Sequence, residues 1–219
     1  MSHLSLPTRR SLLVCSLAVA AVWTSSAALS VCLAQTAAPA HDMAAHQHHH
    51  DIDMNAPLKE RMLDVKLSAI PMVRDDGVST TLEKELSGPN PTILAFIYTS
   101  CTTICPVTSQ LFSNVQDLLQ PELGNVRIVS VSIDPEYDTA TRLHAYAQKF
   151  GAKAQWRHYG GTLGNSVTIQ KLFGAYRGDK MNHVPLVFIN GGGKKGWLQV
   201  EGFPSADVVV KKLHSQMHG

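Results

Sequence analysis

The chain has 219 residues, of which 44% are hydrophobic and 16% are charged. This composition is typical of an ordinary globular protein and excludes the fibrous and disordered classes. The 19 basic residues nearly balance the 17 acidic ones and leave a net charge of +2, so the charge gives no support for binding to DNA or RNA.

The first segment has the features of an export signal. Arg9 and Arg10 precede residues 11–34, which contain no charged residue and end in a small-residue pattern before Gln35. A membrane span needs roughly 20 apolar residues, but the serines and threonine of this run favour cleavage. Residues 1–34 are therefore predicted to be a signal peptide or a membrane anchor, with the Sec and Tat routes both open. The protein is predicted to be periplasmic, in contact with the membrane only through this segment if it stays uncleaved.

Residues 35–57 contain alanine, proline and polar residues without periodicity, and are predicted to form a flexible tether. Histidine and methionine crowd within it, at positions His41, Met43, His46, His48, His49, His50 and Met54. Imidazole and thioether are ligand types that copper accepts. The alternative is a solvated linker whose histidines bind nothing, and both interpretations stay open. The folded domain is expected to cover residues 58–219.

The first half of this domain alternates between strand-like and helix-like segments. Apolar alternation marks residues 63–70, and residues 78–86 resemble a short strand followed by a helical turn. Residues 92–98 form a continuous apolar run, which is typical of a strand buried on both faces of a sheet. A helix is expected after Pro106, with one apolar face, and should end near Pro121.

A second buried strand is expected over residues 126–133. Asp138 or Thr139 can cap the helix that follows, which should end at Gly151, and a third helix is expected over residues 166–176.

The last segment indicates a hairpin and a closing helix. Residues 185–189 are predicted to be a strand, residues 190–193 have turn chemistry, and residues 197–200 return as the hairpin partner. Ser205 can cap the last helix. Strands joined by helices and followed by such a hairpin predict an α/β fold, a thioredoxin-like sandwich with a mixed central sheet flanked by helices.

The four cysteines are of two kinds. Cys15 and Cys32 lie inside the apolar signal, and only Cys101 and Cys105 reach the folded domain. These two lie where a buried strand leads into a helix, so free backbone N–H groups and the helix dipole should lower the pKa of both thiols. A soft anionic pair suits Cu(I) and also thiol exchange. An inert disulfide is the alternative.

The segment around the cysteines resembles the signature of the Sco/SenC/PrrC family, an aromatic-Thr-x-Cys-x-x-x-Cys-Pro pattern, since residues 96–106 read FIYTSCTTICP. Residues 130–139, SVSIDPEYDT, match the family's Ser-x-Asp-Pro-x-x-Asp-Thr segment. The resemblance covers most of residues 58–215. It implies a thioredoxin-like domain that binds copper through two cysteines and a distant histidine. Family members assist assembly of the copper centre of cytochrome c oxidase.

The resemblance identifies His183 as that histidine, so the implied copper ligands are Cys101, Cys105 and His183. The implied function is a non-enzymatic metallochaperone that binds Cu(I), and also Cu(II). Its acceptor would be the apo-subunit of a copper-containing respiratory oxidase, and a copper donor or thiol reductant would act upstream. Asp134 and Asp138 are interpreted as structural residues in a turn and at a helix cap.

Two other functions stay open. In a thiol-disulfide oxidoreductase, Cys101 and Cys105 would be the catalytic redox pair. The Val184-Pro185 sequence favours this role, because it resembles the cis-proline segment that faces the cysteines of thioredoxins. A peroxiredoxin-like peroxidase is disfavoured, because Tyr98 stands where that motif needs proline.

Overall fold

A computed structural model describes residues 54, 56–120, 122–193 and 196–218. They lie in one compact unit, Asp51–Gly219. The predicted signal of residues 1–34 and nearly all of the predicted tether lie outside the described residues. No helix within the described ranges is long and apolar enough to cross a membrane.

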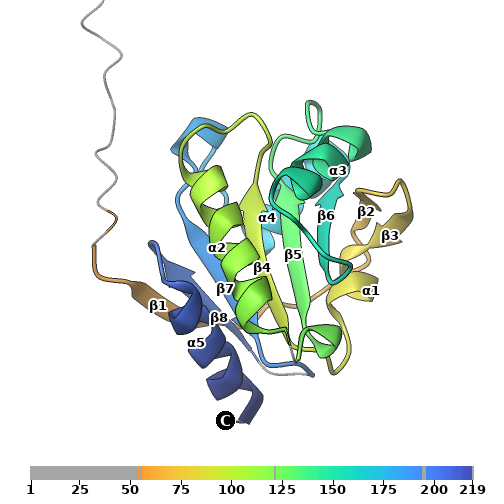
Figure 1. Ribbon diagram of the computed structural model, residues 1–219. Coiled ribbons are helices and arrows are strands. Elements are labelled where there is room, and N and C mark those ends of the chain that lie inside the picture. The colour runs from red at the N-terminus through yellow and green to blue at the C-terminus, as the bar shows by residue number, and fades with distance from the viewer. Residues whose placement is uncertain (1–53, 55, 121, 194–195, 219) are drawn as a thin grey trace, which may run out of the picture. The chain divides into compact units, whose positions relative to one another are not determined.

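The core of the fold is a mixed sheet of eight strands in the order β1-β8-β7-β4-β5-β6-β2-β3 (Figure 1). The central strands β4, β5 and β6 are parallel, and β7 and β8 extend the sheet in antiparallel fashion from β4. The strand bounds are β1 Lys59–Leu63, β2 Pro71–Arg74, β3 Ser79–Thr81, β4 Thr92–Ile97, β5 Arg127–Ser132, β6 Trp156–Gly160, β7 Leu186–Asn190 and β8 Trp197–Glu201.

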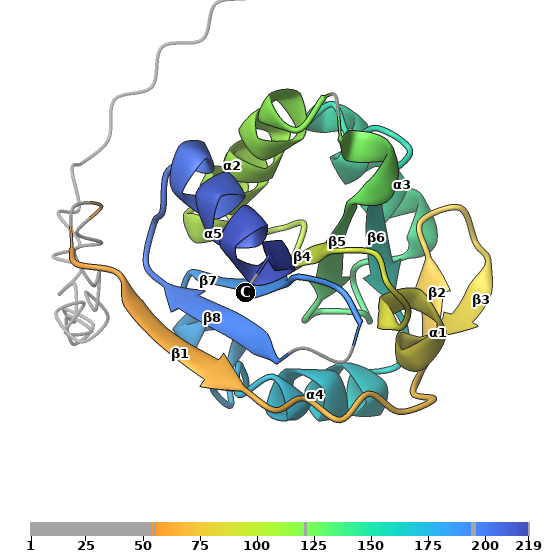
Figure 2. The ribbon, with the colours of Figure 1, turned by 90° about the horizontal axis from the view of Figure 1, so that it is seen from below.

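Helices cover both faces of this sheet. Helices α2 and α5 pack on one face and α4 on the other (Figure 2). The helix bounds are α1 Leu82–Leu86, α2 Ile104–Leu118, α3 Ala140–Lys149, α4 Leu163–Leu172 and α5 Ala206–His218, with short 3-10 turns η2 at Leu123–Asn125 and η3 at Lys180–Asn182. The predicted α/β sandwich with a mixed, helix-flanked sheet is confirmed.

The central position of strand β4 in the sheet explains why its sequence is almost entirely apolar. Ile93 and Ala95 point into the core beneath α2 and α5, whereas Leu94 and Phe96 point into the core on the opposite face. All four are at most 1% exposed. A strand buried on both faces has no position for a polar side chain that lacks a partner, so β4 is a rigid support for the loop that follows it.

Several predicted bounds were wrong. The segment 63–70 is not a strand of its own: β1 ends at Leu63 and β2 begins only at Pro71. Helix α2 begins at Ile104, two residues before Pro106, since proline is tolerated within the first turn of a helix. Helix α4 begins and ends earlier than the predicted residues 166–176.

The predicted caps were partly right. Thr139 caps α3, and its side chain accepts a hydrogen bond from the backbone N–H of Arg142 at 3.3 Å. Asp138, the other candidate for this cap, has a different role, given below. Ser205 accepts a hydrogen bond from the N–H of Val208 at 3.4 Å, as expected at the start of α5.

Candidate functional site

The cysteines lie in the turn between β4 and α2. The backbone N–H of Cys101 donates to the carbonyl of Tyr98 at 3.1 Å and closes the turn that leaves the strand. Thr103 stands at the N-cap of α2 but makes no side-chain capping bond. The free N–H of Cys105 instead points to the Cys101 sulfur at 3.5 Å. The sulfur of Cys101 therefore accepts the hydrogen bond that a capping oxygen accepts in other helices.

The two thiols have opposite acid–base properties. Cys101 and Cys105 are 6% and 1% exposed, and both are free. A hydrogen bond from the Cys105 thiol, with further N–H donors from Cys105 and Thr103, lowers the pKa of Cys101 to about 4. The same contact and burial raise the pKa of Cys105. At neutral pH the site thus contains one thiolate and one thiol, so the expectation of two acidic thiols was wrong.

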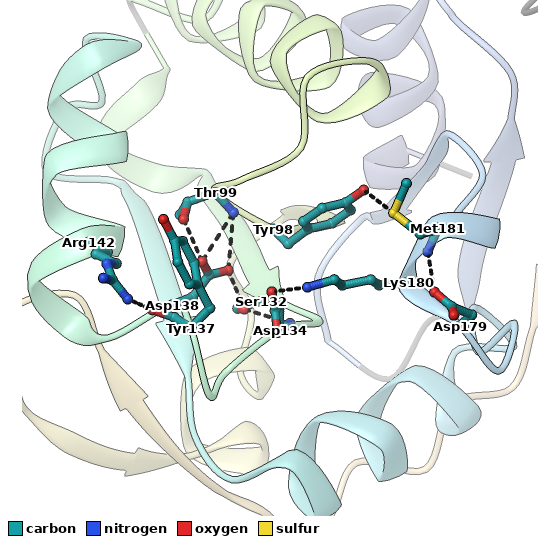
Figure 3. Close-up of polar contacts among 10 residues, drawn as sticks. All are labelled: Tyr98, Thr99, Ser132, Asp134, Tyr137, Asp138, Arg142, Asp179, Lys180 and Met181. Carbon is teal, nitrogen blue, oxygen red and sulfur yellow. Dashed lines mark hydrogen bonds and ion pairs between the residues drawn. The ribbon is translucent and has the colours of Figure 1, made fainter. Parts of the chain in front are cut away.

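A buried carboxylate holds the cysteine loop in place. Asp138 is 1% exposed and accepts hydrogen bonds from the backbone N–H of Thr99 at 3.2 Å and from its hydroxyl at 2.5 Å (Figure 3). It also accepts one from the hydroxyl of Ser132 at 2.6 Å, at the end of β5. Asp138 therefore joins the ends of two parallel strands beneath the cysteines.

His183 approaches the same loop from the segment after η3. Its side chain is hydrogen-bonded through Nε2 to the carbonyl oxygen of Phe96 at 3.0 Å. A carbonyl only accepts, so Nε2 carries the proton and the neutral ring has its lone pair on Nδ1. Burial lowers the pKa of His183, whereas the Phe96 carbonyl and then the Cys101 thiolate act to raise it.

The structure brings two of the three predicted ligands into direct contact. Cys101 and Cys105 share hydrogen bonds, whereas the described contact of the His183 ring is with Phe96. Across the described ranges, no three His, Cys, Asp or Glu side chains are gathered so that they could hold a metal ion together. A three-ligand site in this fold therefore requires the Nδ1 atom of His183 and the two sulfurs to come closer together than they lie here.

The Val184-Pro185 peptide bond is trans, because the described chain contains no cis peptide bond. The expectation that it resembles the cis-proline segment of thioredoxins was therefore wrong. Asp179 caps η3, and His183 then leads in extended conformation from this turn toward β7.

Sequence reasoning missed two contacts at the outer edge of the site. The hydroxyl of Tyr98 donates to the Met181 sulfur at 3.7 Å, and the ammonium of Lys180 pairs with Asp134 at 2.5 Å (Figure 3). A hollow of about 300 Å³, lined in part by Asp134, Lys180 and His183, lies beside them. Only the position of Tyr98, three residues before the first cysteine, could have indicated one of these contacts.

Comparison with known proteins identifies one family. Residues 72–216 match the family model described as SCO1/SenC. The SCO1 protein homolog of Bacillus subtilis is 33% identical over 88 residues, which are 40% of this chain and 45% of that protein. The mitochondrial SCO1 homolog 1 of Arabidopsis thaliana is 39% identical over 83 residues, 37% of this chain and 24% of that protein. The matched regions thus span less than half of either relative.

Solved structures share the fold. A SCO1/SenC family lipoprotein from Bacillus anthracis superposes with a TM-score of 0.62 at 20% identity, covering 72% of this chain and 98% of that one. Arabidopsis thaliana ScoI with copper bound gives 0.59 at 23% identity, covering 68% and 96%. Yeast Sco1 with copper bound gives 0.60 at 15% identity, covering 71% and 93%.

Proposed function

Because this chain belongs to the SCO1/SenC family, we propose that it is an exported copper metallochaperone that serves the assembly of a copper centre of cytochrome c oxidase. It would hold copper through Cys101, Cys105 and His183 and pass it to the apo-subunit of the oxidase. Three of the solved structures with the same fold are described as having copper bound. A further one is described as a member of the Sco family of cytochrome c oxidase assembly proteins.

The observation that supports this function most strongly is the ionisation of the cysteine pair. Thiolates are the ligands that Cu(I) prefers, and a thiol must lose its proton before it binds a metal. Because Cys101 is already a thiolate at neutral pH, only Cys105 has to release a proton when both sulfurs take the ion. The adjacent sulfurs need no rearrangement of the backbone to meet.

His183 would complete the site through Nδ1. The hydrogen bond to Phe96 occupies Nε2, so the nitrogen with the free lone pair is the one available to a metal. Cu(II) binds better when an imidazole is added to the two thiolates, whereas two thiolates can hold Cu(I) by themselves. His183 should therefore contribute more to binding of Cu(II) than of Cu(I).

Competition with a coloured Cu(I) chelator tests the proposal. Cys101→Ser and Cys105→Ser should each abolish tight Cu(I) binding, and His183→Ala should weaken Cu(II) much more than Cu(I). His214→Ala is the matched control, because His214 lies on α5 and contacts Glu122 at 3.1 Å instead of the cysteine loop. Unchanged Cu(I) affinity in either serine variant would rule out the copper site.

The unequal thiols also favour a second candidate, a thiol-disulfide oxidoreductase. The Cys101 thiolate would attack a partner's disulfide, form a mixed disulfide and release one partner thiolate. Cys105 would then lose its proton, attack the Cys101 sulfur and release the second partner thiol. The partner is reduced and the Cys101–Cys105 pair is oxidised, so a dithiol reductant must restore it. Rapid turnover of a disulfide peptide by metal-free protein would support this function over copper delivery.

A further inference from the structure

The segment that carries His183 is largely exposed. It runs from the end of α4 at Leu172 to the start of β7 at Leu186, and its residues 176–182 are all exposed. The short turn η3 is its regular element, and His183 follows this turn directly. A segment with so little burial is not held in place by packing, so its position depends on individual contacts with the rest of the fold.

One ion pair joins this segment to the sheet. The ammonium of Lys180 lies 2.5 Å from the carboxylate of Asp134, and Figure 3 shows the Lys180 side chain extended toward it. Lys180 and His183 belong to the same turn, because the backbone N–H of His183 donates to the Lys180 carbonyl at 3.1 Å. A restraint on the Lys180 side chain is therefore passed to His183 through one hydrogen-bonded turn.

Asp134 is itself well anchored, at the end of β5. Its backbone N–H donates to the Ser132 hydroxyl at 3.0 Å, and its carbonyl accepts a hydrogen bond from the N–H of Asp138 at 2.9 Å. Ser132 in turn donates to the Asp138 carboxylate, which also holds Thr99 at the base of the cysteine loop (Figure 3). One hydrogen-bonded cluster thus holds the cysteine loop and, through Lys180, the segment that carries the histidine.

We infer that the Lys180–Asp134 ion pair is a positioning contact, which keeps His183 beside the cysteine loop before copper arrives. The inference rests on the proposed copper site and adds the residues that place its third ligand. The His183 ring makes the second attachment, from Nε2 to the Phe96 carbonyl. Without the ion pair, fewer molecules would have the ring in this place, and the affinity for copper falls with that fraction. An exposed ion pair changes such an equilibrium by up to about fivefold.

NMR of the metal-free full chain tests the position of His183 without copper. The Nε2 proton of His183 is assigned by its loss in His183→Ala, and its exchange with water reports the bond to Phe96. Lys180→Leu removes the charge and should make this exchange about fivefold faster. Lys180→Arg keeps the charge and should exchange like the parent.

Lys153→Leu is the matched control for this substitution. Lys153 pairs with Asp117 at 3.1 Å, and its side chain is 44% exposed, against 42% for Lys180. Asp117 lies near the end of α2, at the opposite end of this helix from the cysteines. The exchange of the His183 proton should therefore be unchanged in Lys153→Leu.

Optical spectroscopy with Cu(II) tests the effect on the proposed site. The thiolate-to-copper charge-transfer band reports only copper that is bound to cysteine, so copper held elsewhere on the chain does not contribute. Lys180→Leu should raise the Cu(II) dissociation constant measured from this band by about fivefold. The Cu(I) dissociation constant should stay the same, because two thiolates can hold Cu(I) by themselves.

A double-mutant cycle shows whether the two residues act through one contact. Asp134→Asn should raise the Cu(II) dissociation constant as Lys180→Leu does, and the double variant should lose no more than either single one. The inference is overturned if Lys180→Leu keeps the proton exchange or the Cu(II) affinity of the parent, if Cu(I) affinity falls equally, or if the two losses add. If the parent shows no charge-transfer band, the proposed function fails, and the exchange measurement still decides whether the ion pair positions His183.

Discussion

The acidity of Cys101 can be changed by altering one hydrogen-bond donor. The Cys105 thiol is the largest contributor to the low pKa of Cys101, ahead of the backbone N–H groups of the helix start. Cys105→Ala removes this donor, whereas Cys105→Ser replaces it with a hydroxyl donor in the same place. The pKa of Cys101 should therefore rise clearly in the alanine variant and stay low in the serine variant.

The size of the pKa shift of Cys101 determines which measurement is informative. With a pKa of about 4, Cys101 is essentially all thiolate at pH 7, whereas a thiol with its ordinary pKa of 9.0 is only about 1% thiolate. The thiolate fraction thus differs by about a hundredfold. The intrinsic nucleophilicity of a thiolate, however, falls as its pKa falls, with a Brønsted coefficient of about 0.4–0.5. Over five pKa units, this decrease roughly cancels the hundredfold gain in thiolate fraction. The rate at pH 7 alone is uninformative, and the midpoint of the pH profile is the quantity to measure.

The assay is alkylation by iodoacetamide across about pH 3 to 10, with mass spectrometry to assign the modified residue. Parent protein and Cys105→Ser should react at Cys101 with a midpoint near pH 4, and Cys105→Ala with a higher midpoint. Circular dichroism at each pH is the control for acid unfolding. If folded parent protein has a midpoint near the ordinary thiol pKa, Cys101 is not a thiolate at neutral pH. The argument that copper does not have to displace a proton from Cys101 would then fail as well.

Two further changes test groups around the site. Asp138→Ala removes the acceptor of Thr99 and Ser132 and should lower the free energy of unfolding by about 1–3 kcal/mol for each donor left without an acceptor, measured by guanidinium denaturation against the exposed control Asp64→Ala. Burial lowers the pKa of His158 to about 3, and its ring nitrogens have no hydrogen-bond partner among the described residues. His158 should therefore make the parent lose stability as the pH falls from about 6.5 toward 3, by up to about 1.4 kcal/mol per pH unit. The slope should be smaller by this amount in His158→Phe, which keeps the separate contribution of the Cys101 thiolate above about pH 4, and an unchanged slope would contradict the assignment.

The sequence was sufficient to predict the strands that are buried on both faces. Strand β4 is an almost continuous apolar run, and strand β5 alternates valine and isoleucine with small buried serines, so both were expected close to their observed bounds. Strand β6 was missed because Arg157 and His158 interrupt its apolar character, although His158 is fully buried against Trp156 and Tyr146. Edge strand β1 was missed for the opposite reason, since it is mostly charged and exposed and is held by pairing with β8.

The site was predictable only to the level of residue types. The spacing of Cys101 and Cys105 before a helix indicated that the sulfurs meet, but it could not assign the single proton that they share. That assignment depends on which sulfur faces the free N–H groups, and this is a property of the turn. Similarly, the sequence identified His183 through the family resemblance, but only the fold shows that the Phe96 carbonyl engages Nε2.

The acidity of Cys101 also bears on the choice between copper delivery and thiol exchange. Exchange is fastest when the attacking thiol has a pKa near the ambient pH, because a more acidic thiol gains no thiolate and loses nucleophilicity. The pKa of Cys101, about 4, is far below that optimum. For a metal ligand the same acidity is an advantage, because a thiolate does not have to lose a proton before it binds the metal at neutral pH. The trans Val184-Pro185 bond removes the feature that had favoured exchange. Both observations favour a site whose main task is to hold copper.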